Sequence, residues 1–265
     1  MGKSATPNKF VSAMQEVERS LSSLPVHAAK NPKFNLQHYI GTRYSVLGIT
    51  TKQARDRFRK GYRFSRLPLS EQYPLWKYIW QHSRQFDALS QALYFLEIYA
   101  AQCDRDWLRK ELIQWLEQID NWAHSDMLTH HFAALHETSP STMYPVLQTW
   151  NRDPNPWKRR QSVLSLLDYA RFRKKYPAFG RIVQLITPLL HDPDIYVQKG
   201  IGWSLRECHL VYPEKTLEYI TNKHAQLSSI AFTSATEKYK QKEKEKLKAL
   251  RKRSRNNELS KHFKT

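Results

Sequence analysis

Apolar residues recur along this chain with the spacing of α-helices. Leu89, Ala92, Leu93, Leu96 and Ala100 form one such helical stripe. Residues 163–170 and 179–190 show the same spacing. The strict alternation of apolar and polar residues that marks strands is almost absent, and the whole chain holds only seven glycines. The pattern predicts an all-α protein of roughly eleven or twelve helices, about 10–18 residues each, joined by short polar turns.

Two segments of the chain resemble each other at an offset of 39 residues. NRDPNPWKRRQSVLSLL starts at Asn151 and LHDPDIYVQKGIGWSLR starts at Leu190, and they share an Asp-Pro pair, an aromatic residue after it and a later Ser-Leu. We predict that Asp153 and Asp192 cap the two helices. A period near 40 residues is typical of HEAT-like repeats, which stack into a curved solenoid. We therefore expect a HEAT-like solenoid with a concave basic face.

The net charge indicates a polyanionic partner. Lys and Arg number 43 against 24 Asp and Glu, a formal charge of +19. Residues 237–265 hold 12 Lys and Arg against 4 Asp and Glu, so this tail carries +8 and the other residues keep +11. A field of this sign favours nucleic acid. We predict a domain over residues 1–236, followed by a basic tail over 237–265 that begins as a solvated helix and is partly disordered around 251–255. The tail is either a solubilising segment or a phosphate-binding arm or localisation signal.

The sequence gives no support for a disulfide-rich, secreted, membrane-spanning, cofactor-binding or metal-binding protein. The two cysteines, Cys103 and Cys208, lack a CxxC spacing and are predicted to be small buried side chains in a reducing compartment. No signal-peptide run and no 18-residue apolar stretch occur, so we expect no membrane contact and a cytoplasmic, nucleoid-associated protein, or a nuclear one in a eukaryote. We expect no cofactor, because glycine-rich phosphate loops, G-x-S-x-G and HExxH are absent. We also expect no metal, because His124, His130 and His131 do not share one helix face.

The stretch DNWAHSD, which begins at Asp120, places a tryptophan one helical turn before a carboxylate. If Asp120 or Asn121 caps a helix running to about residue 136, Trp122 and Asp126 share one face of it. The large apolar side chains lie on the opposite face, whereas the small or polar Thr129 and Ala133 lie beside the pair. The pair is therefore predicted to point away from the main core. Alternatively, the tryptophan packs on a neighbouring helix and the aspartate serves the helix dipole.

A second tryptophan is predicted off the core on a later helix. Trp203 lies roughly 140° from the apolar stripe of residues 193–210, beside Tyr196, Lys199 and Arg206. Rings interleaved with cations suit stacking on sugars and bases next to phosphate contacts. The alternative is that Trp203 packs between repeats.

Three cations lie in the first turn of the helix that precedes the Trp203 helix. Lys158, Arg159 and Arg160 follow Trp157 in the first turn, where positive charge opposes the helix dipole. We predict that they serve an external anion. The alternative is a basic turn with acidic neighbours from elsewhere in the chain.

Taken together, these segments resemble the AlkD-like DNA alkylation repair family of HEAT-like-repeat DNA glycosylases, over about residues 7–238. The resemblance is carried by YSVLGITTKQAR from Tyr44, DNWAHSD, NPWKRRQSVLSLLDYAR from Asn155 and YVQKGIGWSLREC from Tyr196. The last is the most specific, because QKxIGWxLRE is close to the family pattern in content and place.

The resemblance implies roles for individual residues. Asp126 matches the family's catalytic aspartate, Trp122 and Trp203 match its two lesion-facing tryptophans, Arg160 matches its DNA-backbone arginine and Tyr39 a tyrosine near the DNA. Arg159, Lys199 and Arg206 are the further predicted DNA contacts. The implied activity is that of a monomeric, monofunctional glycosylase, which hydrolyses the N-glycosidic bond of cationic N3- or N7-alkylated purines in double-stranded DNA without a deep base-flipping pocket.

One departure from the family keeps a second function open. Relatives usually carry W-D-x-x-D, whereas this chain has Trp122-Ala123-His124-Ser125-Asp126. The spacing of four residues between the tryptophan and the final aspartate is kept, but the acidic residue directly after the tryptophan is replaced by alanine. The alternative is a non-catalytic HEAT-like-repeat protein that binds branched or damaged DNA, and a protein-binding solenoid is a third possibility.

Overall fold

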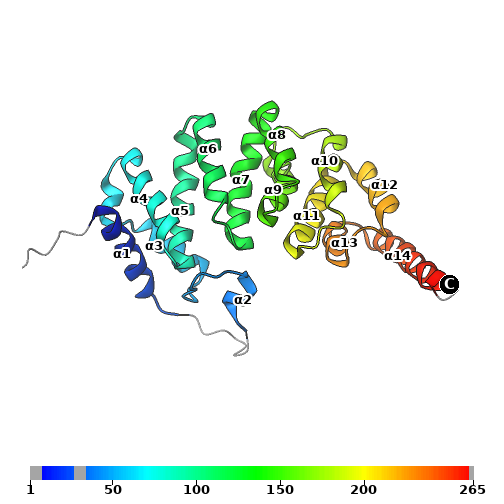
Figure 1. Ribbon diagram of the computed structural model, residues 1–265, viewed down its shortest axis with the longest axis horizontal. Helices are drawn as coiled ribbons and strands as arrows, with labels where there is room; N and C mark the ends of the chain where they lie inside the picture. The colour runs from blue at the N-terminus through cyan, green and yellow to red at the C-terminus, as the bar shows by residue number, and fades with distance from the viewer. Residues whose placement is uncertain (1–7, 27–33, 263–265) are drawn as a thin grey trace, which may run out of the picture. The chain divides into compact units, whose positions relative to one another are not determined.

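The computed structural model describes residues 8–26 and 34–262, with side chains described as far as Ser254 (Figure 1). These residues form fourteen α-helices and four short 3₁₀ helices, and their only β-type pairing is an isolated bridge between Ser45 and Gln85. The all-α prediction is confirmed. The predicted helix number and lengths are wrong, because several helices have fewer than ten residues. The shortest is α2 (Leu36–Ile40), which Gly41 ends in the left-handed conformation at φ 74°.

The chain divides into two compact units, and the division falls inside one helix, after Leu128. Unit 1 comprises residues 1–128, and α1, α4 and α5 pack on one another within it (Figure 1). Its core is rich in large rings: Trp80 and Trp115 are fully buried and stack with centroids 5.0 Å apart. Besides α2, its helices are α1 (Lys9–Ser22), α3 (Thr51–Arg59), η1 (Arg63–Arg66), α4 (Leu69–His82), α5 (Phe86–Tyr99), η2 (Ala100–Gln102), α6 (Arg105–Leu116) and the start of α7 (Trp122–Thr138).

Unit 2 comprises residues 129–265, and α11 packs there against α9, α12 and α13 (Figure 1). The close approach of α11 to α13 requires glycine at position 202, since a Cβ there would lie 2.7 Å from the carbonyl oxygen of Ala231. Its helices after α7 are α8 (Pro140–Trp150), α9 (Pro156–Leu164), η3 (Ala170–Phe172), α10 (Phe179–Ile186), η4 (Thr187–Leu189), α11 (Ile195–Val211), α12 (Pro213–Lys223), α13 (Ser229–Ala235) and α14 (Gln241–His262).

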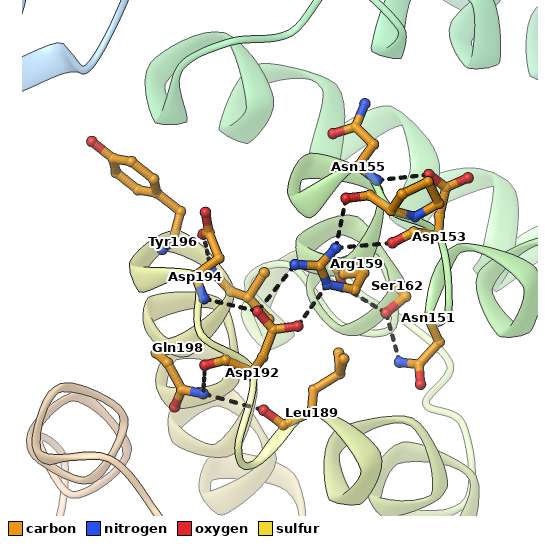
Figure 2. Close-up of polar contacts among 12 residues, drawn as sticks. Asn151, Asp153, Asn155, Arg159, Ser162, Leu189, Asp192, Asp194, Tyr196 and Gln198 are labelled. Carbon is orange, nitrogen blue, oxygen red and sulfur yellow. Dashed lines mark hydrogen bonds and ion pairs between the residues drawn. The ribbon is translucent and has the colours of Figure 1, made fainter.

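The two repeated segments begin their helices in the same way, though not at the predicted caps. The N-caps of α9 and α11 are Asn155 and Asp194, two residues after the predicted Asp153 and Asp192. The predicted residues instead accept the N–H of the caps, Asp153 from Asn155 at 2.8 Å and Asp192 from Asp194 at 2.9 Å (Figure 2). Asp and Asn favour such i to i+2 turns. The 39-residue offset therefore holds for this pair of successive turns.

One arginine joins the two capping turns of unit 2. The guanidinium of Arg159 donates to the carboxylate of Asp192 at 2.6 Å and to the carbonyl oxygens of Asp153 and Pro154 at 2.9 and 2.8 Å (Figure 2). The Asp192 side chain is only 4% exposed, so its charge depends on this partner. The repeated segments are thus held together by charge as well as by apolar packing.

The apolar spacing over residues 163–170 does not continue as a helix. α9 ends at Leu164, and Asp168 adopts a left-handed conformation at φ 54°. Leu166, Leu167 and Ala170 are nevertheless buried, so the chain turns while keeping these side chains in the core. A tight turn and a helix can bury the same residues, which is why the spacing alone predicted the wrong element here.

The basic tail is helical from Gln241 and contacts unit 2 through a few buried side chains. Leu247 and Arg251 of α14 are buried, and the Arg251 guanidinium donates to the carbonyl oxygen of His224 at 2.7 Å and lies over the ring of Phe232. The prediction of disorder around residues 251–255 does not match these contacts at Arg251. A cation–π contact and a capped carbonyl hold that arginine on unit 2.

The two cysteines differ in burial. Cys208 is buried as predicted, whereas Cys103 is only partly buried at the end of η2, where its thiol donates to the carbonyl oxygen of Tyr99. Among the described residues, no helix combines the length and the apolar content needed to cross a membrane.

Candidate functional site

The start of α7 is fixed by two adjacent polar residues. Asn121 caps the helix, because its Oδ1 accepts the N–H of His124 at 2.9 Å. Asp120 accepts the Thr42 hydroxyl at 3.0 Å and the N–H of Arg43 at 2.8 Å. Of the two predicted caps, Asn121 serves that role, while Asp120 fastens residues 42–43 to the start of the helix.

Trp122 is held beside Tyr39 within unit 1. Its indole Nε1 donates to the carbonyl oxygen of Tyr39 at 3.1 Å, and the two rings meet edge to face with centroids 5.6 Å apart. Trp122 is partly buried, whereas Tyr39 is 56% exposed. The structure therefore brings together two residues that were matched separately by the resemblance.

Asp126 lies one turn after Trp122 on α7 and is likewise partly buried. The prediction that their neighbours on the helix, Thr129 and Ala133, lie off the core is wrong, since both are fully buried. The Thr129 hydroxyl and the amide of Gln161 on α9 lie 2.9 Å apart, so α9 covers that side of α7 in unit 2. Helical spacing places residues on a face but does not say how many faces are covered.

His124, two residues after Trp122, belongs to the core of unit 1. Its ring is buried, stacks on Phe86 with centroids 4.2 Å apart, and lies between Ser90 and Asn121. The Ser90 hydroxyl donates to the Phe86 carbonyl oxygen, so it accepts from Nε2 of His124, while the Asn121 amide donates to Nδ1. Burial lowers the pKa of His124 to about 3. This histidine is therefore a neutral core residue of unit 1.

A cavity of about 210 Å³ lies in unit 1 beside Trp122 and Ala123. Its wall includes the rings of Tyr39, Phe86 and Tyr94. Ala123, which stands where relatives usually carry an acidic residue, lines this cavity. The methyl group of Ala123 is apolar, whereas other parts of the wall carry the polar side chains of Asp87 and Ser90.

Trp203 has a comparable setting within unit 2. Its indole Nε1 donates to the carbonyl oxygen of Asp168 at 3.0 Å, and its ring centroid lies 4.8 Å from that of Tyr169. The guanidinium of Arg206 lies 5.4 Å from the tryptophan ring. Trp203 is partly buried rather than fully exposed, because this turn and Arg206 cover it.

Asp168 also faces a histidine of α7 that sequence reasoning did not assign to the site. The Asp168 side chain is 4% exposed, and its Oδ2 lies 3.1 Å from Nδ1 of His130, whose side chain is 54% exposed. Nη2 of Arg173 lies 3.3 Å from the same ring nitrogen, and this arginine also pairs with Glu137 at 3.4 Å. One signal was present in the sequence: His130 follows Asp126 by four residues and so shares its helix face.

In η3, directly after the turn at Asp168, Arg171 and the exposed Phe172 form a group of a cation and an aromatic ring. Phe172 is 51% exposed, and Arg171 lies over the rings of both Phe172 and Tyr169, at 4.7 and 5.2 Å. The Phe172 and His130 ring centroids are 6.0 Å apart. Sequence reasoning missed this group because residues 163–170 were assigned to a continuing helix.

The predicted DNA-binding cations have different surroundings. Nη1 of Arg160 donates to the carbonyl oxygen of Tyr196 at 2.6 Å, and a Cβ at Gly200 would lie 3.3 Å from the Arg160 side chain. Lys199 is exposed, with its ammonium 5.0 Å from the Tyr196 ring. Glycine at position 200 thus leaves room for the arginine, while Lys199 is the predicted cation most open to solvent.

Other cations of this set have acidic partners. Lys158 pairs with Asp153 at 3.2 Å, and Arg206 pairs with Glu237 at 2.9 Å. Arg159 is bound to Asp192 and to two carbonyl oxygens. These contacts favour the alternative of a basic turn with acidic neighbours, and the role of Arg159 as a DNA contact stays a prediction.

Comparisons with known proteins point to one family. A family model described as DNA alkylation repair enzyme matches residues 21–239. The chain is similar in structure to a protein titled as a predicted DNA alkylation repair enzyme from Enterococcus faecalis, with TM-score 0.64 and 15% identity over 78% of this chain and 93% of that one. It is also similar to AlkD2 from Streptococcus mutans, with TM-score 0.55 and 17% identity over 88% of this chain and 100% of that one. No curated protein sequence matches it.

Proposed function

The chain belongs to the DNA alkylation repair enzyme family, and from this premise we propose that it is a DNA glycosylase that releases cationic N3- or N7-alkylated purines from duplex DNA. The observation that carries the proposal is the Trp122–Asp126 pair on α7 inside the matched residues, with both side chains partly buried and Trp122 fixed by the Tyr39 carbonyl. The proposal includes a HEAT-like solenoid with a basic concave face. The capping turns repeated at α9 and α11 support the repeats.

The chemistry requires little more than a carboxylate and ring faces. Alkylation at N3 or N7 gives the purine a positive charge, so its glycosidic bond is weakened before any enzyme acts. When the bond breaks, its electron pair neutralises the base and leaves an oxocarbenium-like sugar. The Asp126 carboxylate would stabilise that cation, as carboxylates do in sugar hydrolases. A neutral leaving group removes the need for a second, acidic carboxyl group.

The tryptophans would supply the remaining recognition. The faces of Trp122 and Trp203 attract the cationic base and sugar, at about 0.5–2 kcal/mol for each contact. A site of this kind recognises the charge of the lesion rather than the shape of the base. Tyr39, Arg160, Lys199 and Arg206 would contact the DNA backbone around it, with the protein acting as a monomer without metal or cofactor.

Base release from methylated DNA tests this function. Duplex DNA treated with a methylating agent is incubated with the wild-type chain or with Asp126→Asn, and free 7-methylguanine and 3-methyladenine are quantified by chromatography. We expect release by the wild-type protein and a reduction of at least about 100-fold in Asp126→Asn, the size expected when a charge-stabilising group is lost. Equal release by the two proteins would contradict the role of Asp126.

A second candidate is a non-catalytic protein that binds branched or damaged DNA. Ala123 favours it, because its methyl group lines the cavity at the position where the W-D-x-x-D pattern has an acidic side chain. This function predicts salt-sensitive DNA binding, with log Kd rising linearly with log salt concentration, and no base release. Negligible DNA affinity at moderate salt would instead favour the third possibility, a protein-binding solenoid.

A further inference from the structure

The face of α7 that carries Trp122 and Asp126 continues to His130. These residues follow one another at intervals of four, so each lies one turn beyond the last. The His130 side chain is 54% exposed, and its Nε2 forms no hydrogen bond within the part of the chain that the structure describes. An imidazole nitrogen open to solvent therefore lies at the start of the part of α7 that belongs to unit 2.

The other nitrogen of His130 is oriented by a buried carboxylate. Oδ2 of Asp168 lies 3.1 Å from Nδ1, and burial at 4% exposure leaves this carboxylate dependent on protein donors. Nη2 of Arg173 is 3.3 Å from the same nitrogen, but Arg173 has Glu137 as its own acceptor at 3.4 Å. An N–H at Nδ1 satisfies Asp168, which leaves the lone pair of a neutral ring on Nε2.

The charged and titratable groups around His130 are few. Asp168 and Arg173 face it from the turn after α9, and Glu137 reaches it only through Arg173. His131 adjoins it on α7, and burial lowers the pKa of His131 to about 4, so that ring is neutral near pH 7. A negative and a positive group thus meet at Nδ1, whereas no hydrogen bond from the described residues reaches Nε2.

Asp168 also holds the second lesion-facing ring. Its carbonyl oxygen accepts the indole N–H of Trp203 at 3.0 Å, while its side chain orients His130. The residue adopts a positive φ of 54°, a conformation that costs energy for a residue with a Cβ and is retained where the surroundings enforce it. One strained residue therefore fixes the positions of both the histidine and the tryptophan.

We propose that His130 is a catalytic base and that Asp168 is the residue that positions it. This inference rests on the proposed glycosylase function. As the glycosidic bond breaks, its electron pair moves to the cationic base. The oxygen of a water molecule forms a bond to C1′, and the water's proton passes to Nε2 of His130. The histidine then returns the proton to solvent. The products are a neutral purine, an abasic sugar with a hydroxyl at C1′ and one released proton, so atoms and charge balance.

Single-turnover excision across pH tests the proposal. A duplex with one 7-methylguanine is cleaved by the wild-type chain, His130→Gln, Asp168→Asn and the matched exposed control His191→Gln. A general base contributes about 10²–10⁴-fold, so we expect His130→Gln to lose at least about 100-fold in rate. The pH profile of the wild-type rate should change in His130→Gln. His191→Gln should behave as the wild type does.

The variants separate this proposal from a purely structural role. His130 is exposed, so His130→Gln should fold normally and bind methylated DNA with unchanged Kd. Asp168→Asn should slow excision about tenfold or more and alter the pH profile of the rate. A wild-type rate and pH profile in His130→Gln, with Asp126→Asn inactive, would overturn the inference alone. A wild-type chain that releases no base would overturn the proposed function and this inference with it.

Discussion

Trp122 in unit 1 and Trp203 in unit 2 are held by the same kind of hydrogen bond, although the segments that accept it are unrelated. Each indole N–H donates to a backbone carbonyl oxygen, that of Tyr39 at 3.1 Å and that of Asp168 at 3.0 Å. Each ring also adjoins a tyrosine, Tyr39 or Tyr169. A donated N–H fixes the ring plane while leaving a face available, which is what a ring needs in order to contact a cation.

The two settings differ in what supports the carbonyl. Tyr39 belongs to the five-residue helix α2, and its own ring is 56% exposed. Asp168 is buried, strained and bonded through its side chain to His130. Local stability follows burial and hydrogen bonding, so we expect Trp203 to be held more rigidly than Trp122. Under the proposed function, the comparison predicts an adaptable contact to the lesion at Trp122 and a fixed one at Trp203.

The largest expected effect is on the pH dependence of stability, and it distinguishes two histidines of α7, the buried His124 and the exposed His130. Buried His124 has a pKa of about 3, so the unfolded chain binds its proton more readily below pH 6.5. Its contribution to stability is therefore present above pH 6.5 and is lost as the pH falls towards 3, at about 1.4 kcal/mol per pH unit. His124→Gln should reduce the pH slope of the unfolding free energy by that amount in urea unfolding between pH 6 and 4, whereas the buried His131 and His136, whose pKa values burial lowers to about 4, still contribute their own slope. The exposed His130→Gln serves as the control and should keep the wild-type slope, and an unchanged slope in His124→Gln would show that this ring is not buried and neutral.

The next effect is on stability, and it tests the strained backbone of Asp168, whose carbonyl oxygen holds Trp203. Asp168→Ala and Asp168→Gly both remove the carboxylate, but only glycine adopts the positive φ of 54° without strain. We expect the glycine variant to be more stable by about 1 kcal/mol. Chemical denaturation of both variants measures the difference. Equal stability would mean that this turn is not held in the left-handed conformation.

A smaller effect compares the two indole hydrogen bonds directly. Trp122→Phe and Trp203→Phe each keep a ring but lose the donated N–H, which is worth about 0.5–1.5 kcal/mol. We expect excision to fall about 2- to 10-fold in each variant, with the larger loss for Trp203→Phe because its partner carbonyl is the more rigid. Single-turnover rates decide the order. A larger loss at Trp122 would reverse the assignment of the adaptable and the fixed contact.

The smallest effect concerns the tyrosine beside Trp122. Tyr39 contacts Trp122 through its ring edge and its backbone carbonyl. Tyr39→Phe keeps both, so we expect the excision rate to change by less than about twofold, whereas Tyr39→Ala removes the ring contact, worth about 0.5–1.5 kcal/mol. A marked loss in Tyr39→Phe would show that the hydroxyl itself contacts the substrate.

The sequence predicts local features of this protein better than its contacts. Helical spacing placed Trp122 and Asp126 on one face of α7, because that relation is internal to a helix. The burial of Thr129 was missed, because it depends on Gln161 of α9 packing against it. The caps were displaced by two residues because Asp153 and Asn155 both favour turns, and only the fold decides which one begins the helix.

The contact between His130 and Asp168 lay beyond sequence reasoning for a similar reason. It joins residues 38 positions apart and depends on a turn that apolar spacing had assigned to a helix. Trp203 was identified from its angle on the helix and from the family resemblance, but its hydrogen bond to Asp168 follows from the same turn. Residues that a tertiary turn brings together leave no periodic signal in a single sequence.

The rate of base excision from a duplex with one 7-methylguanine, measured with protein in excess, tests the central claim most directly. Asp126→Asn is compared with the wild-type chain and with Asp106→Asn, which alters a carboxylate whose side chain is 75% exposed. We predict wild-type release of 7-methylguanine, an unchanged rate in Asp106→Asn and a loss of at least about 100-fold in Asp126→Asn. Tight DNA binding without release by the wild-type chain would contradict the claim and identify a non-catalytic DNA-binding protein.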